Sequence, residues 1–274
     1  MPTFSYPELS LNLVNMYQSQ HTSPYINDIL TDTLKHRFHA IATSLQLTTP
    51  SDYGDRLAKL VKLVVTDRLA DFSDSDQDYG NLDRAVIAIL TGAYWHQDLA
   101  EMRSRILDLQ NYSNVDIPEL LLAYAIAYAC RSKMQPRNFV SQICQDFTKR
   151  RNLSQPFTSQ PEFLAQIQKA HEFAEQGASA IAFHHAHDPS CAKVAIALYY
   201  FLSTPQDWSL VTDRAKIYDC LVAIQAGAIT AAYLGKCDHQ QNPENSIGEH
   251  LWQYWAGYFA PIAAYGHSLI EKLP

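Results

Sequence analysis

The chain has 274 residues, of which 47% are apolar and 18% are charged, so it is long enough to bury a sizeable core. Its formal net charge of −7, without any long basic run, argues against a dedicated nucleic-acid-binding protein. With only 9 glycines, it also lacks the composition of a glycine-rich phosphate-binding fold or of a turn-rich all-β fold. No apolar run approaches the roughly 20 residues of a membrane span, and no signal-peptide pattern opens the chain, so we expect a soluble, cytoplasmic protein.

Apolar residues recur at helical spacing along most of the chain. No alternation of convincing length indicates a strand, so we predict an all-α fold in one domain that spans residues 1–274. The predicted helices cover residues 24–47, 51–69, 82–94, 98–109, 117–130, 138–149, 161–175, 195–202, 221–234 and 249–271.

Three segments are predicted to lie outside these helices. Residues 1–22 fit a short amphipathic helix or an N-terminal arm that packs on the body. Residues 152–160 and 184–190 are polar and contain proline, which favours loops. Because helices of the same kind resume after each of them, we expect both to be surface loops within one domain.

Residues 195–235 are the stretch around which we expect the fold to be organised. Two apolar segments cover residues 195–202 and 221–234. Between them lie a turn at 203–207, in which a capping residue precedes a proline, and then a shorter helix. The second apolar segment interleaves alanines and Gly227 with larger aliphatic residues. A helix so rich in small side chains, and apolar on most faces, is typical of a buried central helix.

The cysteines give no sign of a disulfide or zinc framework. They are five in number, and none are spaced as CxxC. We therefore expect buried free thiols in a reducing compartment.

Three short segments carry groups of possible metal ligands. Asp32 lies between two threonines, as in a fragment of a metal site, but the exposed face of a helix is the favoured interpretation. Asp74 and Asp76 begin an alternation that is typical of a calcium loop, but the glutamate expected at the twelfth position is missing, which favours an exposed linker. The segment from His184 to His187 holds three histidines, but a proline follows at once, so a solvated loop is favoured over a zinc site.

Two runs, LYYFLSTPQDWSLVTDRA and AIQAGAITAAYLG, resemble the C-terminal half of the ADP-ribosylglycohydrolase family, in particular its divergent cyanobacterial members. Members of that family carry an apolar helix and then a turn that leads to an acidic and an aromatic residue, here Asp207 and Trp208. A helix rich in small residues follows and ends in a characteristic segment, here residues 231–235. The resemblance extends over most of residues 80–235 and implies an all-α architecture of the ADP-ribosylglycohydrolase type.

The resemblance also implies where metal ions would bind. Active members carry a Gly-Asp-x-Asp-Thr segment that supplies carboxylates to two magnesium ions. Counting back from Gly235, the two aspartate positions hold Tyr218 and Cys220, the threonine position holds Leu221, and Asp219 is the single carboxylate, one place out of register. Magnesium needs several oxygen ligands, and a two-metal centre needs carboxylates from more than one helix, so we expect no such centre, no bound cofactor and no catalytic residue of the family's type.

Three functions are compatible with these residues. The first is a non-catalytic binding or regulatory protein, with a protein partner or an ADP-ribose-like ligand and without contact to nucleic acid or membrane. The second is an active, magnesium-dependent hydrolase of ADP-ribosyl groups whose acid/base site is rebuilt from other carboxylates, with Asp32, Asp74, Asp76 and Asp219 as candidates.

The third is a helical protein-interaction scaffold. The closing segment supplies aromatic anchors of the kind enriched at interfaces, although the same rings fit a core, which we favour. These aromatic residues are Trp252, Tyr254, Trp255, Tyr258 and Phe259.

Overall fold

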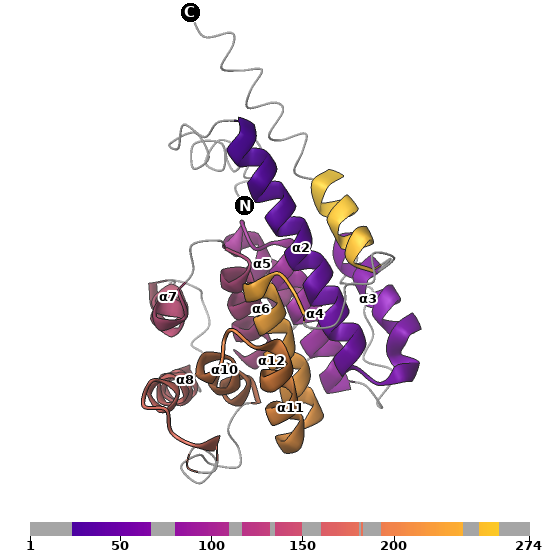
Figure 1. Cartoon of the computed structure of the whole chain (residues 1–274). Helices are drawn as coiled ribbons and strands as arrows, with labels where there is room; N and C mark the ends of the chain where they lie inside the picture. The colour runs from indigo at the N-terminus through magenta and orange to yellow at the C-terminus, as the bar shows by residue number, and fades with distance from the viewer. Residues whose placement is uncertain are drawn as a thin grey trace, which may run out of the picture.

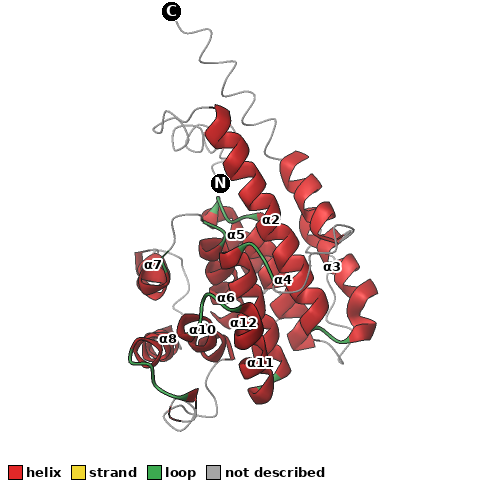
Figure 2. Cartoon of the chain, viewed as in Figure 1, coloured by secondary structure: helices red, strands yellow, loops and turns green. Residues whose placement is uncertain are grey.

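The computed structural model describes residues 24–66, 80–109, 117–131, 135–149, 160–180, 182, 193–237 and 247–257. All regular structure within these ranges is helical, which confirms the predicted all-α class (Figure 1, Figure 2). None of the helices in these ranges is long and apolar enough to cross a membrane.

The described helices match the predicted ones, with ends displaced by a few residues, but residues 67–69 and 258–271 of two predicted helices lie outside the described residues. They are α2 (Pro24–Thr48), η1 (Ser51–Tyr53), α3 (Gly54–Val65), α4 (Gly80–Tyr94), α5 (Leu99–Leu109), α6 (Ile117–Ala129), α7 (Pro136–Lys149), α8 (Gln160–Glu175), α10 (Lys193–Ser203), α11 (Trp208–Tyr218) and α12 (Cys220–Leu234), and residues 247–257 are also helical.

Of the three further segments that the sequence sets apart from these helices, two lie outside the described residues. These are the N-terminal arm at 1–22 and the loop at 184–190. Of the loop predicted at 152–160, only Gln160 is described, and it is the first residue of α8 rather than part of a loop.

Helix α12 lies at the centre of the described fold, as its small residues predict. It contacts α11, α2, α10, α6 and α4, and every residue from 222 to 232 is buried (Figure 1). Gly227 lets three helices meet, because a Cβ there would lie 2.8 Å from Cγ2 of Thr212 on α11 and 3.0 Å from Oγ of Ser44 on α2. The Trp208 indole fixes the same crossing, since its Nε1 donates to Ser44 Oγ and to the Gly227 carbonyl, both at 3.1 Å.

Helices α4 and α6 form a second close pair. A Cβ on Gly92 of α4 would lie 2.9 Å from the Cα of Ala123 on α6, and closer still to its carbonyl oxygen. Both helices are buried on nearly every face, which is why their sequences show little one-sided patterning.

The turn after α10 differs in detail from the prediction. Ser203, the first residue of the predicted turn, is instead the last residue of α10, and its hydroxyl donates back to the Tyr199 carbonyl at 2.6 Å. The residue that caps α11 is Asp207, whose Oδ1 accepts the Leu210 N–H at 2.8 Å. A serine hydroxyl can satisfy either end of a helix, whereas an ionised carboxylate only accepts hydrogen bonds and is favoured at a helix N-terminus.

Two buried charged residues join elements far apart in the chain. Asp83 of α4 is 1% exposed and accepts hydrogen bonds from the Tyr53 hydroxyl and from Arg56 Nε, the latter at 3.0 Å. Arg37 of α2 donates from Nη1 to the carbonyls of Ala129 and, at 3.1 Å, of Ala232. Because both carbonyls belong to the last turns of their helices, Arg37 supplies partners that α6 and α12 lack within themselves.

The core interpretation is confirmed for only some of the aromatic residues at positions 252–259. Trp255 is buried, and its ring lies 5.9 Å from that of Phe38 on α2. Trp252 is partly buried, but Tyr254 is 46% exposed, so the core interpretation is wrong for Tyr254. The other two residues of the set, Tyr258 and Phe259, lie outside the described residues.

The cysteines are free thiols in the described ranges, but not all of them are buried. Cys130 and Cys237 are buried and Cys144 is partly buried, as predicted. Cys220 is exposed, which contradicts the expectation, because it begins α12 on the side that faces solvent. Cys191 lies outside the described residues.

Candidate functional site

The four positions where the family resemblance places metal ligands form the junction between α11 and α12. Tyr218 is the last residue of α11, Asp219 links the two helices, and Cys220 and Leu221 open α12. Asp219 has an extended backbone (φ −164°, ψ 139°), and its Oδ1 accepts the backbone N–H of Leu221 at 2.7 Å and that of Val222 at 3.3 Å. Its carboxylate is therefore the N-terminal cap of the central helix.

The second oxygen of the Asp219 carboxylate is also engaged. Lys193, the first residue of α10, places its Nζ 2.7 Å from Asp219 Oδ2. Burial opposes ionisation of Asp219, but the hydrogen bonds from Lys193 and from the two backbone N–H groups outweigh it and lower the pKa of the carboxyl. The junction thus holds one ionised carboxylate, and the ammonium group of Lys193 balances its charge.

The other three side chains at the junction offer no set of hard oxygen ligands. Tyr218 is 44% exposed, Cys220 is exposed, and Leu221 packs against the core. No group of three or more His, Cys, Asp or Glu side chains able to hold a metal ion occurs in the part of the chain that the structure describes. The donors at this junction do not fit a pair of magnesium ions, which need several oxygen ligands each.

Of the remaining carboxylate and histidine candidates, the structure describes only Asp32, which does not join this site. Asp32 is on the exposed face of α2, where its Oδ2 lies 3.6 Å from His36 Nδ1, as the solvent-face alternative predicts. Asp74, Asp76 and the segment from His184 to His187 lie outside the described residues.

The geometry of α2 and α12 shows how far Asp32 is from Asp219. The two helices run antiparallel, because Arg37 contacts the C-terminal part of α12 at Ala232 whereas Ser44 lies beside Gly227. Asp32 precedes Arg37 on α2 and so lies near the C-terminal end of α12, whereas Asp219 lies at its N-terminal end. At 1.5 Å per residue, the two carboxylates are on the order of 20 Å apart.

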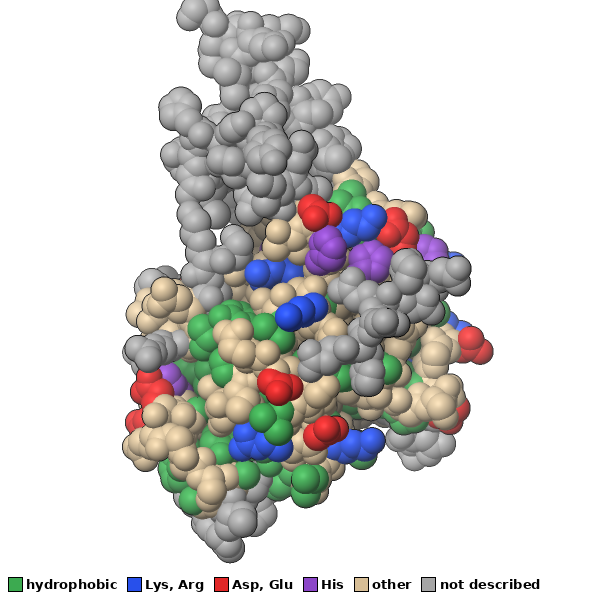
Figure 3. All heavy atoms as spheres, in the orientation of Figure 1, with side chains coloured by type: hydrophobic (Ala, Val, Ile, Leu, Met, Phe, Trp, Pro, Cys, Tyr) green, Lys and Arg blue, Asp and Glu red, His purple; other side chains and the backbone are tan. Residues whose placement is uncertain are grey.

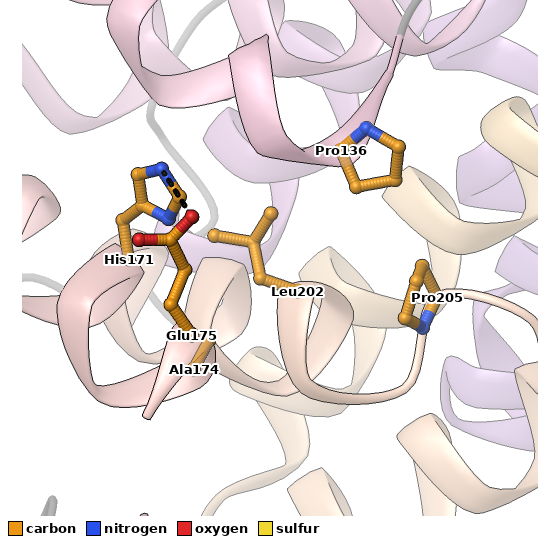
Figure 4. A pocket seen from close by; sticks show the side chains of 6 residues that line it. All are labelled: Pro136, His171, Ala174, Glu175, Leu202 and Pro205. Carbon is orange, nitrogen blue, oxygen red and sulfur yellow. Dashed lines mark ion pairs between the residues drawn. The ribbon is translucent and has the colours of Figure 1, made fainter. Parts of the chain in front are cut away.

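A surface cleft of about 560 Å³ lies elsewhere, between α7, α8 and the end of α10. Its walls are formed by Pro136, His171, Ala174, Glu175, Leu202 and Pro205 (Figure 4). His171 and Glu175 are one turn apart on α8, with 3.8 Å between Nε2 and Oε1, and the side chain of Leu202 lies between this pair and the two prolines.

The cleft and the α11–α12 junction are separate places in the fold. Lys193, which pairs with Asp219, is the first residue of α10, whereas Leu202 is near its last, so the two places are about 13 Å apart along that helix. The cleft offers one imidazole and one carboxylate against apolar walls, without a second carboxylate for paired acid/base work. In the sequence, the only signal for it is the four-residue spacing of His171 and Glu175.

Comparison of the chain with protein-family models, with curated proteins and with solved structures found no match. The family likeness of residues 80–235 therefore rests on the sequence runs alone.

Proposed function

We propose that this chain is a degenerate relative of the ADP-ribosylglycohydrolases that binds a ligand or a protein partner and has no dinuclear magnesium centre. The observation that carries the proposal is the α11–α12 junction, where the single carboxylate, Asp219, caps α12 and pairs with Lys193. Magnesium bound there would have to displace an ammonium group and would then find a phenol, a thiol and an aliphatic side chain as neighbours.

The separation of the carboxylates supports the non-catalytic form of the proposal over a rebuilt hydrolase. General acid/base hydrolysis uses two groups a few ångströms apart whose pKa values differ. Asp32 and Asp219 are at opposite ends of α12, and Asp32 is exposed to solvent. These two residues are therefore too far apart to act as a pair.

Thermal melts with ADP-ribose and with magnesium, separately and together, test the proposal. ADP-ribose at a hundred times its Kd would stabilise the chain by about 2.7 kcal/mol and raise Tm by about 5 °C. The proposal expects magnesium alone to leave Tm unchanged and no release of ADP-ribose from a modified protein.

The matched control variant is Asp219→Asn, which keeps a capping side chain but removes the charge. A magnesium-dependent rise in Tm that disappears in this variant, or measurable release of ADP-ribose, would refute the non-catalytic proposal.

A specific surface feature favours the scaffold as a second candidate function. Helix α11 exposes three large apolar side chains, with Leu210 at 43%, Ile217 at 89% and Tyr218 at 44% exposure. Exposed apolar groups on one helix are typical of contacts with another protein. If neither ADP-ribose nor magnesium shifts the melt, a scaffold predicts an assembly larger than a monomer in analytical ultracentrifugation, which Ile217→Glu dissociates and Lys216→Glu does not.

A further inference from the structure

The helical residues 247–257 lie along α2, near the C-terminal end of α12 (Figure 1). The approach is close, because a Cβ on Gly248 would lie 2.9 Å from the Cα of His39. One turn further along, the ring centroids of Trp252 and Trp255 lie 6.3 Å and 5.9 Å from that of Phe38 on α2. An aromatic face and a glycine thus hold residues 247–257, which we call the closing helix, against α2.

Polar contacts also join the closing helix to α2. Oε2 of Glu249 lies 3.2 Å from Nε2 of His39 and 3.3 Å from Nζ of Lys35, and its Oε1 accepts from Gln253 at 3.1 Å. Figure 3 shows histidine, lysine and acidic side chains gathered on one face of the molecule, on the side where α2 meets the closing helix in Figure 1. The His39 side chain is only 15% exposed, and Gly248 and Glu249 of the closing helix contact it.

A second histidine lies under the closing helix. His96, in the turn between α4 and α5, is 3% exposed, and its Nδ1–H donates to the Ala93 carbonyl at 2.8 Å. Its ring lies 5.8 Å from that of Trp255 at an angle of 30°, and 6.1 Å from that of Phe38. The closing helix therefore contacts two imidazoles, His39 through Glu249 and His96 through Trp255.

Burial disfavours protonation of both imidazoles while the closing helix is bound. Burial lowers the pKa of His96 to about 4, and the nearby guanidinium groups of Arg131 and Arg37 act in the same direction. Burial also lowers the pKa of His39, against the opposing effect of Glu249 and together with Lys35 and His36. Each imidazole is thus held in the neutral form.

Glu249 alone does not bring the pKa of His39 back to its ordinary value. A protonated His39 would pair more strongly with Glu249, but Lys35 already neutralises the same carboxylate oxygen. The uncovered state of each histidine therefore binds a proton more readily than the covered state, and acid favours uncovering.

We propose that the closing helix is an acid-released clasp: protonation of His96 and His39 lifts residues 247–257 from α2 and uncovers the apolar surface around Phe38. This inference concerns a different part of the molecule from the proposed function and does not depend on it. The surface that opens is the one that Trp252 and Trp255 cover in the closed state.

Hydrogen exchange of the full chain, followed by mass spectrometry at pH 8 and pH 5, tests the clasp. If release restores His96 to an ordinary pKa near 6.5, the opening equilibrium rises about 30-fold between these pH values, and the protection factors of residues 247–257 fall by the same factor. Protection in α12 should stay constant. Unchanged protection of residues 247–257, or an equal loss in α12, overturns the proposal.

Two variants assign the effect to the histidines. His96→Phe keeps a ring between Phe38 and Trp255 but does not titrate, so the pH dependence of residues 247–257 should fall to a few-fold. His171→Gln, on the distant helix α8, is the matched control and should retain the full effect. If His96→Phe does not fold, judged by circular dichroism, His39→Gln should still reduce the pH dependence, and full retention in His39→Gln overturns the proposal.

Discussion

Replacing Gly92 by alanine tests whether α4 and α6 meet as closely as the structure indicates. The added Cβ would lie 2.9 Å from Ala123 Cα and closer still to its carbonyl oxygen, and neither backbone atom can rotate away. The helices would have to separate, at a cost of about 3 kcal/mol, the upper end for overpacking. Alanine recovers about 1 kcal/mol of helix propensity, so the net loss is about 2 kcal/mol.

Gly54→Ala is the matched control for the same chemical change. Gly54 begins α3 with ordinary helical angles (φ −56°, ψ −47°), and a Cβ there meets nothing within 4 Å. This variant should therefore be stabilised, by about 0.5 kcal/mol. In thermal melts followed by circular dichroism, Gly92→Ala should lower Tm by about 4 °C and Gly54→Ala should raise it slightly. Equal stability of the two variants would refute the close approach of α4 and α6.

Three further substitutions probe the polar contacts. Asp83→Ala leaves the Arg56 guanidinium without its buried partner and should cost about 3 kcal/mol in urea unfolding. Arg37→Met deprives the last carbonyls of α6 and α12 of a charged donor and should cost about 2 kcal/mol, measured in the same way. Asp219→Ala removes the cap of α12 and should cost about 1 kcal/mol at pH 7. Because the folded state lowers the pKa of Asp219, its ionised form stabilises the fold above the ordinary pKa, and the difference between wild type and Asp219→Ala should shrink as pH falls through the lowered value.

The helices, and the central place of α12, follow from local patterns in the sequence. The small residues around Gly227 predict a buried helix because few other arrangements hide a helix that is apolar on most faces. Which residue of the turn at 203–207 caps α11 depends on where α10 ends, and that depends on packing of Phe201 and its neighbours in the core. Local propensity cannot decide it.

The cleft and the role of Asp219 depend on contacts between distant parts of the chain. Pro136, His171 and Leu202 belong to three different helices, so no sequence spacing brings them together. The contact of His96 with Trp255, 5.8 Å between ring centroids, likewise joins residues far apart in the sequence. The sequence does predict that Asp219 is the single carboxylate of its segment, but the partner that neutralises it, Lys193, is 26 residues away and becomes visible only once α10 lies beside α12.

The most direct test of the central claim is to count the magnesium that the chain holds. Equilibrium dialysis of the full chain against millimolar magnesium, followed by elemental analysis of metal per chain, measures it without any assumption about substrate. A junction with one carboxylate, already paired with Lys193, predicts no magnesium above the level of the Asp219→Asn variant. Two magnesium ions per chain, lost in that variant, would contradict the account.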